Sequence, residues 1–172
     1  MLGFKRLTAE NWTDPDPVNR HFARISPIAG PVAMEGGDWA REFLAVSVAD
    51  HVPEEVADLF AVARGAMLYG WFFYPLFRIG EEQLFRVLET AARIRYSELG
   101  GGAARPGFKE AIIYLLDRGV IAADQVERWE AARQLRNQTS HPSNATVTTP
   151  GSVLGTLALC AGDIDALFRS GG

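Results

Sequence analysis

The chain has 172 residues, 48% of them hydrophobic, and its 17 Lys and Arg against 21 Asp and Glu give a net charge of -4. That apolar content is enough for one globular domain with its own core, and the negative charge gives no electrostatic reason for strong non-specific binding to nucleic acid. A single cysteine, Cys160, excludes an internal disulfide, and no Cys/His cluster has the spacing of a structural zinc site. We therefore expect a cytoplasmic protein without a bound metal or cofactor.

The first 36 residues differ from the rest of the chain. They contain Pro15, Pro17, Pro27 and Pro31 and keep no sustained helical or strand period. The pattern predicts an irregular N-terminal arm over residues 1–36, with a short strand around residues 21–25, followed by a helical domain over residues 37–172. The opening residues lack the apolar run of a signal peptide, so export is not expected.

Helix signals begin after the arm. Asp38 is placed to cap a short helix extending to Asp50, and Pro53 followed by two acidic residues is a strong start for a longer one. Pro75 should end or kink that helix, and a second long helix is expected to reach Leu99. The most apolar stretch, residues 66–77, is too short to cross a bilayer, so we expect no membrane segment and assign its aromatic residues to core or dimer packing.

The second half of the chain predicts three more helices. After a glycine-rich loop at residues 100–107, a short helix is expected over residues 108–118, with Gly119 at its end. The next helix begins near Asp124, and the last begins at Pro150 with apolar residues at helical spacing as far as Phe168. The predicted fold class is all-α, an antiparallel bundle of five or six helices joined mostly by short loops.

The helix that begins near Asp124 has two faces that contain apolar residues. At about 100° per residue, Ala131, Ala132 and Leu135 fall on one side, and Val126 and Trp129 fall on the other, among arginines. We expect the aliphatic side to pack into the bundle. Because tryptophan and arginine are favoured at interface cores, the side with Val126 and Trp129 is predicted to form a dimer interface or a cleft.

The same helix leads into the sequence LRNQTSHP, Leu135 to Pro142. Arg136 and His141 form an Arg-x4-His pattern, Asn137 follows the arginine directly, and Asn137 and His141 are spaced i, i+4, so the amide can orient the imidazole. In an all-helical chain, this pattern near the end of a late helix resembles the HEPN superfamily. The resemblance covers roughly residues 53–168.

The resemblance implies a metal-independent endoribonuclease that acts as a homodimer, with both Arg-His pairs in one cleft. Arg136 would clamp the phosphate, His141 would be the acid or base, and Asn137 would position the histidine, while Arg133 or Ser140 would contact the RNA. Such enzymes include toxins and phage-defence effectors, so an antitoxin or regulatory protein is a further expected partner. Some HEPN toxins have a tyrosine two places after the histidine that a partner enzyme modifies, and this chain has Ser143 there.

Structural alternatives remain open for the same residues. Arg136 and His141 could serve only the end of the helix, Arg133 could pair with Glu130, and the pair Glu89 and Arg93 could be a stabilising ion pair or place an acid near the cleft. The competing hypothesis for the whole chain is a non-catalytic helical module that dimerises or binds a protein partner.

Overall fold

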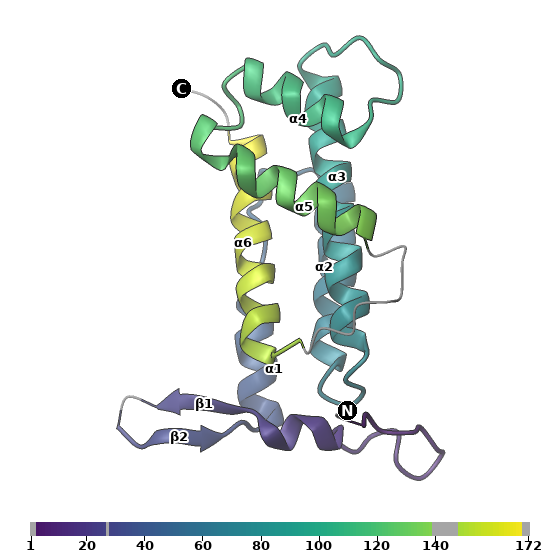
Figure 1. The fold of residues 1–172 in the computed structure, drawn as a ribbon, viewed down its shortest axis with the longest axis vertical. Coiled ribbons are helices and arrows are strands. Elements are labelled where there is room, and N and C mark those ends of the chain that lie inside the picture. Colours follow the sequence, from purple (N-terminus) through teal and green to yellow (C-terminus); the bar gives the residue numbers. More distant parts are fainter. Residues whose placement is uncertain (1–2, 27, 139–147, 170–172) are drawn as a thin grey trace.

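A computed structural model describes residues 3–26, 28–138 and 148–169. It confirms the predicted all-α bundle, to which a two-stranded hairpin and two 3-10 turns are added (Figure 1). The helices are α1 (Gly36–Leu44), α2 (Glu54–Tyr69), α3 (Leu76–Glu98), α4 (Phe108–Asp117), α5 (Val126–Gln138) and α6 (Pro150–Phe168). The strands are β1 (Ala23–Ser26) and β2 (Gly30–Ala33), and the 3-10 turns are η1 (Pro17–His21) and η2 (Ala123–Gln125).

Three long helices form the body of the bundle. α2 and α3 are joined by a short turn and are antiparallel, while α6 lies beside them (Figure 1). The Tyr74 hydroxyl, in the α2–α3 turn, donates to the Thr148 carbonyl at 2.6 Å, and the Ala49 amide, before α2, donates to Asp165 at 2.8 Å. α6 therefore starts near the end of α2 and ends near its beginning, so it runs in the same direction as α3. The shorter α4 and α5 lie between α3 and α6 in the chain, and α5 crosses α3 obliquely (Figure 1).

Most helix boundaries follow the expected start and stop residues. Pro53 immediately precedes α2, Thr149 caps α6 through the Ser152 amide at 3.2 Å, and Pro150 occupies its first turn. After α4, Gly119 adopts a left-handed φ of 70°, which glycine alone reaches without steric cost. These residues stop or start helices through local geometry, so the sequence was sufficient to place them.

The predicted helix over residues 38–50 is an exception, because α1 spans only Gly36–Leu44. Beyond Leu44, long-range partners satisfy the backbone in place of a helical ladder. The Val46 carbonyl accepts from Arg64 Nη1 at 2.8 Å, and the Ala49 amide donates to Asp165 of α6. This segment is thereby attached to α2 and α6, and Val46 and Val48 pack against the core.

One hydrophobic core runs through the bundle. Its largest side chains with almost no exposure come from α1 to α6: Trp39, Trp129, Phe43, Phe60, Phe77, Met67, Leu84, Leu88, Leu115, Leu157 and Ile164. Cys160 belongs to this core as predicted, and burial raises the pKa of its thiol to about 12. A thiol in that state is almost entirely protonated at neutral pH and is a poor nucleophile.

The N-terminal arm covers the aromatic α2–α3 turn. Asp16, 0% exposed, accepts from the amides of Val18 at 3.1 Å, Lys5 at 3.2 Å and Tyr74 at 2.9 Å, which joins the arm to the turn. Phe4 packs edge-on against Phe73, with 5.9 Å between ring centroids. Several of the aromatic side chains that the sequence left between core and dimer packing therefore meet the chain's own arm.

Candidate functional site

Arg136, the proposed phosphate clamp, lies in the last turn of α5. Its Nε donates to Oε2 of Glu89 at 2.7 Å, its Nη1 lies 3.4 Å from the Asn137 side-chain oxygen, and 40% of the side chain is exposed. The carboxylate thus orients the guanidinium from one edge in a side chain that is partly exposed. A guanidinium held in this way loses less conformational freedom on binding an oxyanion.

Glu89 supplies the carboxylate from the middle of α3 and is only 5% exposed. Its second oxygen, Oε1, forms an ion pair with Arg93, in which Nη2 lies 2.7 Å away, and Arg93 Nε donates to the Pro106 carbonyl at 2.9 Å. One buried carboxylate therefore connects two guanidiniums from different helices. The sequence offered Glu89 either as the partner of Arg93 or as an acid near the cleft, and the structure brings it to both arginines.

The local charge at this site is positive. Glu89, Arg93 and Arg136 together carry one negative and two positive charges, a net +1 in a chain whose formal charge is -4. Arg93 also borders an open hollow next to the 100–107 loop, whose other charged lining residues are Arg105 and Glu98. The arrangement can attract an anion although the whole protein cannot.

Arg133 makes the pair with Glu130 that the sequence offered as its structural alternative. Its guanidinium makes a bidentate pair with Glu130 one turn earlier, with Nε donating to Oε2 at 2.8 Å. The hydrogen bond from Arg133 lowers the pKa of the Glu130 carboxyl to about 2. Arg133 therefore faces a carboxylate on its own helix, whereas Arg136 reaches a different helix.

Asn137 follows Arg136 in the chain, and its exposed side chain lies next to the Arg136 guanidinium. Ser140 and His141 lie outside the described residues. The expected contact between Asn137 and His141, and the histidine's part in the site, therefore remain predictions.

The predicted orientation of α5 is wrong. Trp129, assigned to an exposed dimer interface, is 2% exposed and packs edge-on against Phe108 of α4, with ring centroids 6.3 Å apart. Val126 is half-buried, and Leu135, assigned to the bundle interior, is 44% exposed. The physical reason is that an indole removes far more apolar area from water than any other side chain on this helix, so its burial determines which face turns inward.

Two other properties of the described residues bear on the site. Within residues 3–26, 28–138 and 148–169, no three His, Cys, Asp or Glu side chains gather closely enough to hold a metal ion. Among the described helices, α6 alone is long and apolar enough to cross a membrane by length and composition, and 44% of the stretch concerned is buried inside the protein. Helices packed in a protein core often share those two properties.

Comparisons with protein-family models, with curated proteins and with solved structures gave no match.

Proposed function

We propose that this protein is a metal-independent endoribonuclease of HEPN type that works as a homodimer. The observation that supports it best is the ion pair between Arg136 and Glu89, because it orients the arginine of the Arg-x4-His pattern at the end of α5. A phosphate clamp needs a guanidinium with a fixed direction, and this side chain is also partly exposed. Asn137 follows it, and His141 is four residues further along the chain.

The reaction requires one base, one acid and a stabiliser of negative charge. The neutral imidazole of His141 takes the proton from an RNA 2'-hydroxyl, and the 2'-oxygen attacks the adjacent phosphorus. The bond from phosphorus to the 5'-oxygen breaks, and the second protomer's histidine protonates that oxygen as it leaves. Arg136 stabilises the charge that builds on the equatorial phosphate oxygens. The products are a 2',3'-cyclic phosphate and a 5'-hydroxyl, and DNA is not cut because it lacks the nucleophile.

The positive charge around Glu89 supports a phosphate ligand at this position. Arg93 shares the carboxylate with Arg136 and borders the hollow beside the 100–107 loop, so a second phosphate of the same strand has a cation within reach of the site. Contacts of this kind position a strand without selecting its sequence. We accordingly expect Arg93 to contribute little to sequence preference, and we expect the rate of RNA cleavage to depend strongly on Arg136.

The ribonuclease homodimer and the competing hypothesis, a non-catalytic dimerisation or protein-binding module, both used the face of Trp129 as the expected interface. That side chain is buried inside the protomer. Its burial removes that interface from both hypotheses, and the non-catalytic module becomes one outcome of the test below.

The test compares the wild-type protein with Arg136→Ala, His141→Ala and Arg133→Ala in excess EDTA, on single-stranded RNA, tRNA and DNA of matched sequence. Arg133 is a suitable control because it lies on the same helix and pairs with Glu130 instead of Glu89. We expect cleavage of RNA only, cyclic phosphate ends, loss of at least about a hundredfold in rate for Arg136→Ala and His141→Ala, and a change within about threefold for Arg133→Ala.

Three results would contradict the proposal. They are cleavage of DNA, cleavage that persists in both the Arg136 and the His141 variants, and no cleavage of either RNA by a well-folded wild-type dimer. The last would favour the non-catalytic module and direct the search to its partner.

A further inference from the structure

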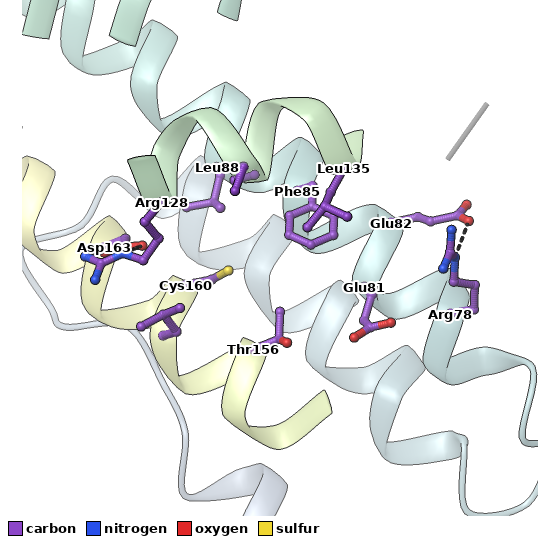
Figure 2. Close-up of a pocket in the computed structure, with 13 residues that line it drawn as sticks. Arg78, Glu81, Glu82, Phe85, Leu88, Arg128, Leu135, Thr156, Cys160 and Asp163 are labelled. Carbon is purple, nitrogen blue, oxygen red and sulfur yellow. Dashed lines mark hydrogen bonds and ion pairs between the residues drawn. The ribbon is translucent and has the colours of Figure 1, made fainter. Parts of the chain in front are cut away.

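A groove separate from the Arg136 site opens between α3, α5 and α6. It encloses about 260 Å³, and Figure 2 shows Phe85 and Leu135 on one side, with Thr156 and Cys160 of α6 on the other. Leu88 and Leu159 extend the apolar lining. Neither Glu89, Arg93 nor Arg136 borders it, so this groove is not part of the ribonuclease site.

The charged residues around the groove are paired, with one exception. Arg78 Nε donates to Glu82 at 3.1 Å, and Arg128 makes a bidentate pair with Asp163, in which Nε donates to Oδ2 at 3.0 Å. Glu81 lies between these two pairs and forms no hydrogen bond or ion pair with any residue that the structure describes. The groove therefore carries two positive and three negative charges, and the surplus is the carboxylate of Glu81.

The ionised carboxylate of Glu81 is unfavourable for the fold at this position. Glu81 is half-buried on α3 beside an apolar wall, and burial raises the pKa of its carboxyl, an effect that Arg78 opposes and Glu82 reinforces. An unpaired carboxylate in such surroundings loses hydration that no protein group replaces. An acid whose pKa is perturbed and that lines a pocket is a candidate for a binding site.

We propose that this groove binds a small organic monocation, with an ammonium group on Glu81 and an apolar body against Phe85, Leu135 and Leu159. The ligand is expected to be positively charged, because Glu81 is the charged residue of the groove that has no oppositely charged partner. The apolar lining favours a ligand whose remaining part is apolar. The volume of the groove lies just below the roughly 300–1,000 Å³ of sites for drug-sized ligands, so the ligand is small. The chemical class is an aliphatic or aromatic primary amine.

The proposal predicts a defined pH dependence. A cation binds the ionised carboxylate, so affinity should fall as the pH falls through the raised pKa of Glu81. The other titratable or charged groups around Glu81 are Tyr74, Arg78 and Glu82 near the start of α3, Arg128 of α5, and Cys160 and Asp163 of α6. The Glu81→Gln variant identifies the responsible group, because the other six remain unchanged in it.

The experiment titrates the full chain with 2-phenylethylammonium and, as matched probes, with neutral 2-phenylethanol and anionic 3-phenylpropionate. Binding is measured by calorimetry and by NMR shifts of the Leu135 and Thr156 amides. Glu81→Gln is compared with Glu98→Gln, which makes the same change near the other end of α3, where Glu98 forms an exposed pair with Arg95. We expect saturable binding of the amine at neutral pH, weakened at least about tenfold by loss of the charge on either the ligand or Glu81.

Glu98→Gln should change the affinity by less than about twofold. The proposal is overturned if the amine causes no saturable shifts at millimolar concentration, if the neutral or anionic probe binds as well as the amine, or if Glu81→Gln leaves the affinity and its pH dependence unchanged. Since this groove and the Arg136 site share no residue, each of these results is independent of any ribonuclease assay.

Discussion

Glu81 and Glu89 show how much one residue type can differ within a single helix. They lie eight residues apart on α3, yet Glu89 forms ion pairs with two guanidiniums while Glu81 meets an apolar groove. Replacing each carboxylate with the amide of the same shape should consequently have opposite effects. Glutamine removes a favourable charge at one position and an unfavourable charge at the other.

At Glu89, we expect Glu89→Gln to lower the free energy of unfolding by about 1–2 kcal/mol. Breaking a fully buried pair costs more, but Arg93 and Arg136 are 45% and 40% exposed, so water screens part of the interaction. If the proposed function is correct, cleavage should also fall by about tenfold or more, because Arg136 loses its orientation. Urea denaturation measures the first effect and the RNA assay the second. Unchanged stability would show that the ion pair contributes nothing to the fold.

At Glu81, the expected effect depends on pH. The folded-state pKa is raised above the ordinary value of 4.5, so the folded protein binds the proton more tightly than the unfolded chain does. The free energy of unfolding therefore decreases as the pH rises from below 4.5 through the folded-state pKa. Glu81→Gln should be more stable than the wild type at pH 7, and the difference should vanish in acid. Thermal unfolding of both proteins between pH 4 and pH 8 checks this, and an equal difference at every pH would contradict it.

At the scale of elements, a glycine sets how closely α3 approaches α2. Gly80 of α3 lies against α2, where an added Cβ would overlap the Met67 side chain and lie 3.0 Å from the Ala63 carbonyl oxygen. Backbone atoms at that distance cannot give way as a flexible side chain can. The tight contact between α2 and α3 therefore depends on the absence of a side chain at this position.

We expect Gly80→Ala to lower the free energy of unfolding by about 1–3 kcal/mol, because the overlap outweighs the better helix propensity of alanine. Gly65 of α2 is the matched control, since a Cβ there would meet nothing within 4 Å. Gly65→Ala should raise stability by about 0.5–1 kcal/mol. Denaturant titration of both variants is sufficient, and a stabilised Gly80→Ala would mean that α3 can move away from α2 without cost.

At the scale of the whole molecule, the N-terminal arm is joined to the bundle by a buried carboxylate. Asp16 accepts from three backbone amides, one of which, that of Tyr74, belongs to the α2–α3 turn. Asn19 adds a hydrogen bond to the Trp71 carbonyl at 2.7 Å. The local structure therefore changes at residue 36, but hydrogen bonds join the arm to the helical part of the chain.

We predict that Asp16→Ala lowers the free energy of unfolding by about 2–4 kcal/mol, because it leaves buried amides without an acceptor. Hydrogen exchange should accelerate at the amides of Val18 and Tyr74 together, on both sides of the junction. Asp14→Ala is the control, since that side chain is exposed. Faster exchange limited to the arm would show that the α2–α3 turn holds its shape without Asp16.

The sequence by itself determined most of the helices and the candidate arginine. Helix starts and ends at Pro53, Gly119 and Pro150 depend on the backbone within a few residues, so local rules were enough to place those helices. Arg136 and Asn137 were found by their spacing along the chain, and Cys160 by the apolar stripe of its helix. Ser140 and His141 were proposed in the same way and remain predictions.

Only the tertiary structure decided which faces meet. α5 has apolar residues on both sides, so its periodicity could not say that Trp129 would turn inward and Leu135 outward; the competition for burial against α3 and α4 settled that. The contact between Glu89 and Arg136 joins residues 47 positions apart, and the groove around Glu81 needs three helices at once. Such pairings depend on long-range packing, which local propensity and spacing do not encode.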